Sequence, residues 1–221
     1  ARCRDSYTDP AVWDRFDPKL VTLCSPDPQA FRPPGEGVNV LQVRLATNFK
    51  AARFDSDAHT ALLRELAAGV EAARFEAGKE RIELPVKLKV HESVFVPLAK
   101  WAMLIAGNYR CVEADRVVPI RDVVHRDLAA SRAVYEWVVD LCIALGASRD
   151  DMVPFEKYAN AALSLLTPSS AARALEAGAP RIERVDRLVQ AVAAQHGMRS
   201  AVLDETVRNV DEWLVRNRRK G

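Results

Sequence analysis

The sequence predicts a mainly helical protein that begins with a small β-containing part. Two regions of different composition and residue pattern within the 221 residues support this division. Residues 1–54 are rich in proline and contain two short apolar runs of strand-like composition. From Asp55 onward, apolar residues recur at helical spacing between residues that cap or stop helices. We therefore expect two domains, residues 1–54 and residues 55–221.

The two strand candidates of the first part cover residues 20–24 and 38–45. The second run is apolar or β-branched at most positions and lies between Gly37 and Asn48. Prolines surround both runs, and proline is confined to the edges of sheets because it cannot donate a ladder hydrogen bond. We expect both strands to lie at the edge of a larger structure.

The helical part starts with Asp55-Ser56-Asp57, which offers cap candidates for a helix that runs to about residue 77 and stops at Gly78. Residues 84–90 then alternate like a strand. Gly146, Gly178 and Gly197 supply later stop signals. Further helices are predicted over residues 93–107, 123–145, 150–166, 169–178, 180–196 and 201–218.

The composition excludes several classes of function. A net charge of +2, with basic residues scattered among acids, gives no support for a nucleic-acid partner. The four cysteines and four histidines are dispersed and match no metal-ligand spacing, so we expect no metal and reduced thiols. No apolar run is long enough to span a bilayer, and no signal peptide opens the chain. We expect a cytoplasmic protein without a membrane contact.

Lys100 is the main candidate for chemistry, because it is the one charge in the apolar stretch 93–107. A helix that is apolar on every side belongs in a core, and a buried ammonium must be paired or have a lowered pKa. Such a lysine can donate a proton near neutral pH. The alternative is a lysine whose stem lies along apolar surface while its head reaches water.

Four other residues of the helical part have a functional and a structural interpretation. Asn108 lies about 80° round an α-helix from Lys100, so the two can line one cleft, but Gly107-Asn108 can equally end a helix in left-handed conformation. Ser169 and Ser170 can hold a carboxylate or cap a helix. Glu183 can support such a site or be a solvated first-turn acid.

Asn48 and Lys50 form a polar cluster at the end of a strand candidate, where α/β proteins often bind ligands. We predict them as weak cofactor-binding candidates. The alternative interpretation is a turn, because asparagine after a strand is first of all a turn residue.

The order of signals in the helical part resembles that of a known family. Lys100 on an apolar helix is followed by Asn108, Thr-Pro-Ser-Ser at 167–170, Arg-Ile-Glu-Arg-Val-Asp at 181–186, Gln-His-Gly at 195–197 and a final helix. This pattern is similar to the C-terminal domain of the ketopantoate reductase (2-dehydropantoate 2-reductase) family over roughly residues 40–215. The likeness is one of order and spacing.

The resemblance implies a fold and an activity. It implies a helical substrate and dimerisation domain of the 6-phosphogluconate-dehydrogenase-like type, preceded by the end of a Rossmann domain that binds NADPH. The reaction implied is the NADPH-dependent reduction of a 2-keto acid to a 2-hydroxy acid. By the same resemblance, Lys100 is the catalytic proton donor, Asn108 and Ser169 or Ser170 hold the substrate, and Glu183 is the nearest equivalent of a downstream acid.

The sequence departs from the family pattern at three points. Leu104 stands where the family has its first substrate asparagine, and leucine cannot hydrogen-bond a hydroxyl or carboxylate; this favours a more apolar keto acid. Glu183 is one residue out of the usual spacing. No Gly-X-Gly-X-X-Gly occurs, so we expect that the nucleotide-binding domain is truncated and that this chain alone does not bind NADPH.

A second hypothesis comes from another class of function. The chain can be a non-catalytic helical dimerisation domain, a scaffold in which Lys100 only reaches for solvent. Under either hypothesis we expect a homodimer, because the predicted helices carry more apolar surface than one layer can bury.

Overall fold

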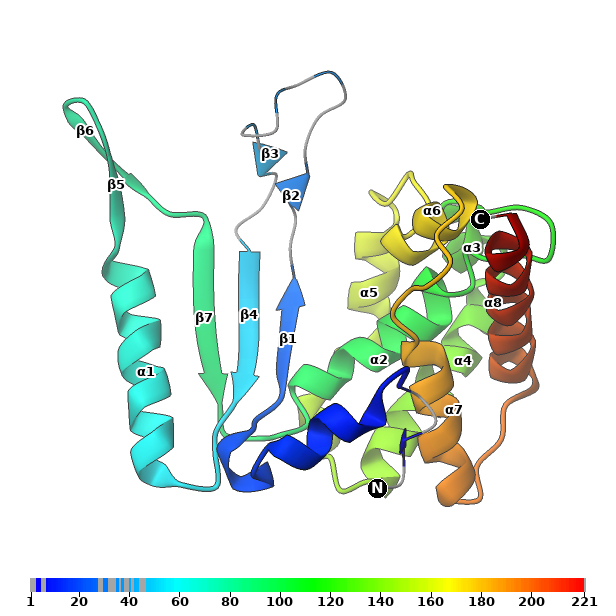
Figure 1. Cartoon of the computed structure of the whole chain (residues 1–221), viewed down its shortest axis with the longest axis horizontal. Coiled ribbons are helices and arrows are strands. Elements are labelled where there is room, and N and C mark those ends of the chain that lie inside the picture. Colours follow the sequence, from blue (N-terminus) through cyan, green and yellow to red (C-terminus); the bar gives the residue numbers. More distant parts are fainter. Residues whose placement is uncertain are drawn as a thin grey trace. The chain divides into compact units, whose positions relative to one another are not determined.

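A computed structural model describes residues 3, 4, 7–27, 30, 31, 35, 37, 40, 42, 43 and 47–220 (Figure 1). The protein is mostly helical, with 56% of the chain in helices and a small mixed sheet near the N-terminus. This confirms the predicted fold class at that level. The chain forms two compact units, Asp14–Leu98 and a second that combines Ala1–Trp13 with Ala99–Gly221. We call them the sheet unit and the helical unit.

The sheet unit is built on three strands in the order β1-β4-β7 (Figure 1). Strand β1 (Cys24–Asp27) pairs antiparallel with β4 (Thr47–Ala52), and β4 pairs parallel with β7 (Val86–His91). Parallel neighbours need a crossover connection, which helix α1 (Asp57–Ala72) provides. The pairing sets Cys24 opposite Ala51 and Ala51 beside Val90.

Two short antiparallel pairs complete the sheet unit. Strands β5 (Arg74–Ala77) and β6 (Glu80–Glu83) form a hairpin whose turn contains Gly78 at φ +66°. Strands β2 (Ala30–Phe31) and β3 (Gln42–Val43) form the other pair. Among the described residues, β1 is preceded by 3₁₀ turns at Pro10–Arg15, which crosses from the helical unit into the sheet unit, and at Pro18–Leu20.

Several sequence predictions for this unit need correction. The strand predicted over residues 20–24 starts only at Cys24, because Pro18 opens a 3₁₀ turn that Asp17 caps. Most of the second candidate, 38–45, lies outside the described residues. Helix α1 begins at the predicted cap, Ser56, but ends at Ala72, and Gly78 turns a hairpin instead of stopping the helix. The strand predicted over 84–90 is confirmed as β7.

The helical unit has a core of its own. Its helices are α2 (Lys100–Met103), α3 (Ile120–Arg126), α4 (Leu128–Ala144), α5 (Phe155–Ala162), α6 (Ser170–Glu176), α7 (Val185–Gln195) and α8 (Ala201–Lys220). The rings of Tyr135, Phe155 and Tyr158 pack together, and Tyr135 stacks on Tyr158 with centroids 5.4 Å apart. Ile105 and Val138 are also fully buried.

The helix boundaries differ from prediction where the backbone changes direction. The helix predicted over 123–145 is two helices, because Asp127 is extended and its side chain caps α4 through the Ala130 amide at 2.9 Å. The helix predicted over 150–166 is a 3₁₀ turn, Arg149–Asp151, followed by α5. Helix α7 begins at Val185 and not at Pro180.

The sheet unit continues past residue 54, where the sequence predicts a domain boundary. Helix α1 and strand β7 extend the sheet unit to Leu98, because the parallel pairing of β7 with β4 ties these residues to the first strands. Within the described ranges, no helix is long and apolar enough to cross a lipid bilayer.

Candidate functional site

The segment that carries Lys100 and Asn108 lies in the core of the helical unit. It runs from a 3₁₀ turn, Pro97–Ala99, through α2 into a π-helical turn, Leu104–Asn108. Ala102, Ile105, Ala106 and Gly107 are buried, which confirms the predicted core helix. Lys100 is half-buried and is the first residue of α2, so the charge stands near the start of the helical segment and not in its middle.

The π-helical turn separates Lys100 from Asn108. Its i→i−5 geometry is shown by the Tyr109 amide, which donates to the Leu104 carbonyl at 2.9 Å. Such single turns are rare inside helices and are frequent at functional sites. The predicted 80° between Lys100 and Asn108 assumed α-helical geometry throughout, so it does not describe this segment.

Gly107 is required by close packing and not by an unusual backbone angle. Neither Gly107 nor Asn108 has a positive φ, so the predicted left-handed helix end is wrong. A Cβ on Gly107 would lie 1.9 Å from the hydroxyl oxygen of Tyr158. That hydroxyl donates to the Met103 carbonyl at 3.2 Å. Tyr158 therefore holds the helix at the point where the π-helical turn begins.

Ser169 is joined to Asn108 through the main chain. Its hydroxyl donates to the Asn108 carbonyl at 2.7 Å and accepts from the Ala172 amide at 3.2 Å, and the residue is only 4% exposed. The capping interpretation of Ser169 is confirmed, since it is the N-cap of α6. Ser170 is exposed, and its hydroxyl accepts from Arg173 at 3.4 Å. Of the two, Ser170 has the hydroxyl that faces solvent.

The Glu183 main chain is linked to Tyr109, the residue after Asn108, which the sequence did not indicate. The Tyr109 hydroxyl donates to the Glu183 carbonyl at 2.6 Å and accepts from the Val185 amide at 3.1 Å. Burial raises the pKa of Tyr109 well above its ordinary value, so the hydroxyl keeps its proton. The carboxylate of Glu183 is on an exposed residue that precedes α7, so it is not a first-turn acid.

An ion-pair network follows directly after Glu183. Arg184 donates to both carboxylate oxygens of Asp186, at 2.9 and 2.8 Å, and to Asp211 of α8 at 2.5 Å. Asp186 is 0% exposed. Burial opposes the charge of Arg184, but its hydrogen bonds to Asp186 and Asp211 outweigh that effect and raise its pKa. No sequence signal linked Arg184 to Asp211, which is 27 residues away.

The candidate residues therefore fall into two groups. Ser169 contacts the Asn108 main chain, the Glu183 main chain contacts the neighbouring Tyr109, and Lys100 begins the same helical segment as Asn108. Asn48 and Lys50 belong to the other unit, where both are half-buried on β4 beside Lys87 and Lys89 of β7. Asn48 lies within a strand and not in a turn.

The described residues also show where metal-ligating side chains and thiols lie. No cluster of three or more histidine, cysteine or acidic side chains capable of holding a metal occurs among them. Burial raises the pKa of both Cys111 and Cys142 to about 11, so neither thiol is reactive near neutral pH.

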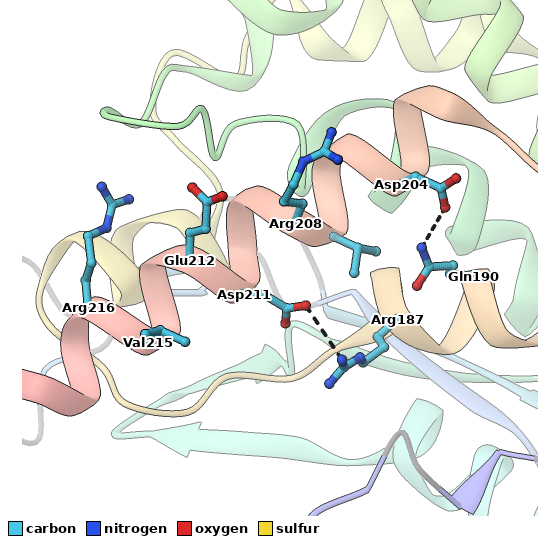
Figure 2. Close-up of a pocket in the computed structure, with 9 residues that line it drawn as sticks. Arg187, Gln190, Asp204, Arg208, Asp211, Glu212, Val215 and Arg216 are labelled. Atoms are coloured by element: carbon cyan, nitrogen blue, oxygen red, sulfur yellow. Dashed lines mark hydrogen bonds and ion pairs between the residues drawn. The ribbon is translucent and has the colours of Figure 1, made fainter.

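The helical unit also has an open groove of about 580 Å³ along α7 and α8, shown in Figure 2. It is lined by Arg187, Gln190, Asp204, Val207, Arg208, Asp211, Glu212, Val215 and Arg216. None of the predicted site residues lines it. Nothing in the sequence analysis pointed to this groove.

Comparison of the chain with protein-family models, with curated proteins and with solved structures finds no match.

Proposed function

We propose that this chain is the substrate half of an NADPH-dependent oxidoreductase of the ketopantoate reductase type, which reduces a 2-keto acid to a 2-hydroxy acid. In this proposal the helical unit is the 6-phosphogluconate-dehydrogenase-like substrate domain, and the sheet unit is part of a Rossmann domain. The observation that carries the proposal is the segment Lys100–Asn108, which places a half-buried lysine and a half-buried asparagine on one core-held helix.

The roles of the residues follow from the chemistry of the carbonyl group. When hydride adds to the keto carbon, the carbonyl oxygen gains negative charge and needs a proton. Lys100 donates that proton, which leaves a neutral amine and a secondary alcohol. The Asn108 amide and the exposed Ser170 hydroxyl hydrogen-bond the oxygen atoms of the substrate, those of its carboxylate included. Leu104, half-buried between Lys100 and Asn108, favours a substrate with an apolar side chain.

The sheet unit, taken by itself, offers only part of a site for the cofactor. A bound NADPH supplies the hydride, and the sheet unit offers Asn48 and Lys50 with Lys89 on one face of β4 and β7, a cationic surface that suits phosphate. The sequence contains no glycine-rich turn to hold a pyrophosphate. We therefore assign only the substrate half of the reaction to this chain.

The sheet unit supports its assignment to a larger α/β domain. It contains a β-α-β crossover with parallel strands, which is the repeating element of such domains. It also exposes large apolar side chains at Leu62, Leu66, Phe75 and Ile82. A Rossmann sheet that continues beyond these strands would cover such surface.

The alternative function is a non-catalytic helical dimerisation domain. The observation that favours it is Ser169, whose hydroxyl is already used for the cap of α6 and for the Asn108 carbonyl. In that case Lys100 only extends toward solvent.

The experiment compares NADPH oxidation by the wild-type protein and its variants with a panel of 2-keto acids, in the longest reading frame that contains this chain. We expect Lys100→Ala to lower kcat by about 10² to 10⁴-fold and Asn108→Ala to act mainly on KM. Lys157→Ala, at an exposed lysine of α5, is the matched control and should leave both unchanged. Equal activity of Lys100→Ala and Lys157→Ala would favour the scaffold.

A further inference from the structure

The outer face of α8 carries charges that alternate in sign along the helix. Asp204, Arg208, Glu212 and Arg216 are four residues apart, all exposed, and all line the groove of Figure 2. Residues four apart lie on one side of an α-helix, so these charges form a single stripe. The stripe and the groove lie wholly within the helical unit.

Two charges of the stripe have no partner in the part of the chain that the structure describes. Arg208 and Glu212 make no hydrogen bond or ion pair there, with each other or with any other described residue. The two ends of the stripe have only neutral partners. Asp204 accepts from the Gln190 amide at 2.6 Å, and Arg216 donates to the Ala114 carbonyl at 2.7 Å.

We propose that this stripe binds α8 of a second copy of the chain in antiparallel orientation. A twofold axis near Val210 would set Asp204 opposite Arg216 of the partner subunit and Arg208 opposite Glu212 of the partner subunit. Both pairs join opposite charges, and the twofold axis repeats each of them. Parallel pairing would instead place like charges opposite each other, so the order of signs selects the antiparallel dimer.

The symmetry and extent of the stripe agree with binding of a second copy of the chain. A twofold interface uses the same patch on both subunits, so the patch must be complementary to itself. The stripe runs from Asp204 to Arg216, twelve steps along the α-helix or about 18 Å. Val215, which lines the groove and is 39% exposed, adds apolar surface to the contact. An interface so rich in exposed charge is weak and sensitive to salt.

The test measures the mass of the full chain in solution by sedimentation at low and at high salt. The wild-type chain should form a dimer that dissociates as salt rises. Arg208→Glu and Glu212→Arg should each weaken the dimer at least about tenfold, because each replaces two attractive pairs by two repulsive ones. Lys157→Glu and Glu176→Arg are matched charge reversals at exposed sites away from the groove and should not change the mass.

Mixing the two variants provides the decisive measurement. Arg208→Glu chains carry acids at both 208 and 212, whereas Glu212→Arg chains carry arginines at both. The mixture should therefore form a one-to-one heterodimer, although each variant alone is monomeric. That result cannot come from pairing within one helix or from misfolding.

Three results would overturn the proposal: a monomeric wild-type chain at the highest soluble concentration, a wild-type mass for both variants, or a mixture that stays monomeric. The mass of the chain is measured without substrate or cofactor. The outcome is therefore separate from the fate of the proposed oxidoreductase activity.

Discussion

The two units of this chain bury their apolar residues very differently. In the helical unit, Tyr135, Phe155 and Ile105 are fully buried, together with Leu141, Leu175 and Leu203. Among the described residues of the sheet unit, the buried ones are small or polar or proline: Ser25, Ala51, Ala52, Thr60 and Pro97. A three-stranded sheet with one helix cannot bury much more. The helical unit therefore has a core of large apolar side chains of its own, whereas the described part of the sheet unit has none.

The largest expected effect is the loss of a core aromatic ring. Phe155 is 2% exposed and packs against Tyr135 and Tyr158, so Phe155→Ala should cost about 3–5 kcal/mol of unfolding free energy. The same change at Phe75, which is 58% exposed on β5, should cost about 0.5 kcal/mol or less. Urea unfolding of both variants measures the difference. Equal losses would show that Phe75 is covered in solution.

The next largest effect is the difference in unfolding free energy lost when a buried and an exposed carboxylate are each neutralised. Asp186→Asn removes the charge that neutralises Arg184 in the interior, and breaking such a pair should cost about 3 kcal/mol. Asp57→Asn in the sheet unit breaks the pair with Arg53, but the Asp57 side chain is 95% exposed. That change should cost less than about 1 kcal/mol. Thermal unfolding compares the two, and a small loss for Asp186→Asn would mean that Asp211 alone satisfies Arg184.

Glycine-to-alanine changes in the two units should have opposite signs. Gly107→Ala forces a methyl group against the Tyr158 hydroxyl, so we expect a loss of about 1–3 kcal/mol. Gly69→Ala lies in the interior of α1 with no atom within 4 Å of the new methyl group, so it should stabilise the protein by up to about 1 kcal/mol.

A double variant tests the cause of the Gly107 effect. In Gly107→Ala with Tyr158→Phe, the hydroxyl that clashes is gone, so the loss should be smaller than the sum of the two single losses. Additive losses would contradict the contact. Disappearance of the π-helical turn in a crystal structure of the double variant would show that Tyr158 maintains it.

The smallest effect is a dependence of stability on pH in the sheet unit. Burial, and then the charges of Lys50 and Lys89, lower the pKa of His91 below its ordinary value of 6.5. The unfolded chain therefore takes up a proton first, so stability is complete above pH 6.5 and is lost as the pH falls below it. The loss stays under the roughly 1.4 kcal/mol per pH unit that one proton imposes.

Urea midpoints at about pH 7 and 5 measure this dependence. The stability lost between these two pH values should be smaller in His91→Leu than in the wild type. It should be unchanged in His196→Leu, at an exposed position of the helical unit. If His91→Leu loses as much stability as the wild type, other groups cause the effect.

The sequence predicted those features that depend on neighbouring residues in the chain. Ser56, one of three predicted cap candidates, caps α1, and Ser169 caps α6 as one of its two interpretations allowed. The strand predicted over 84–90 is found at 86–91. A serine hydroxyl or an alternating pattern acts within a few residues, so both leave a signal in the sequence. The hairpin at Gly78 was missed because glycine with positive φ serves both a helix end and a tight turn. The choice depended on Phe75 pairing with Ile82.

The candidate site was predicted as a set of residue types but not as an arrangement. Lys100, Asn108 and Ser169 were identified from the sequence, whereas Tyr109 and Tyr158, which connect this region, were not. Both tyrosines act over long separations, Tyr109 on Glu183 and Tyr158 on Met103. A contact between residues 55 or 74 positions apart leaves no periodic signal in one sequence.

The sequence by itself determined that the chain is mainly helical, where α1, α6 and α8 begin, and that Lys100 belongs to an apolar helical segment. Only the tertiary structure decided that this helix widens into a π-helical turn, that α1 belongs with the sheet, and that Arg184 pairs with Asp211 as well as with Asp186. The physical reason is the distance along the sequence over which each kind of interaction acts. Caps, turns and hydrophobic spacing act within a few residues, whereas close packing and buried charge pairs depend on groups that meet only once the chain has folded.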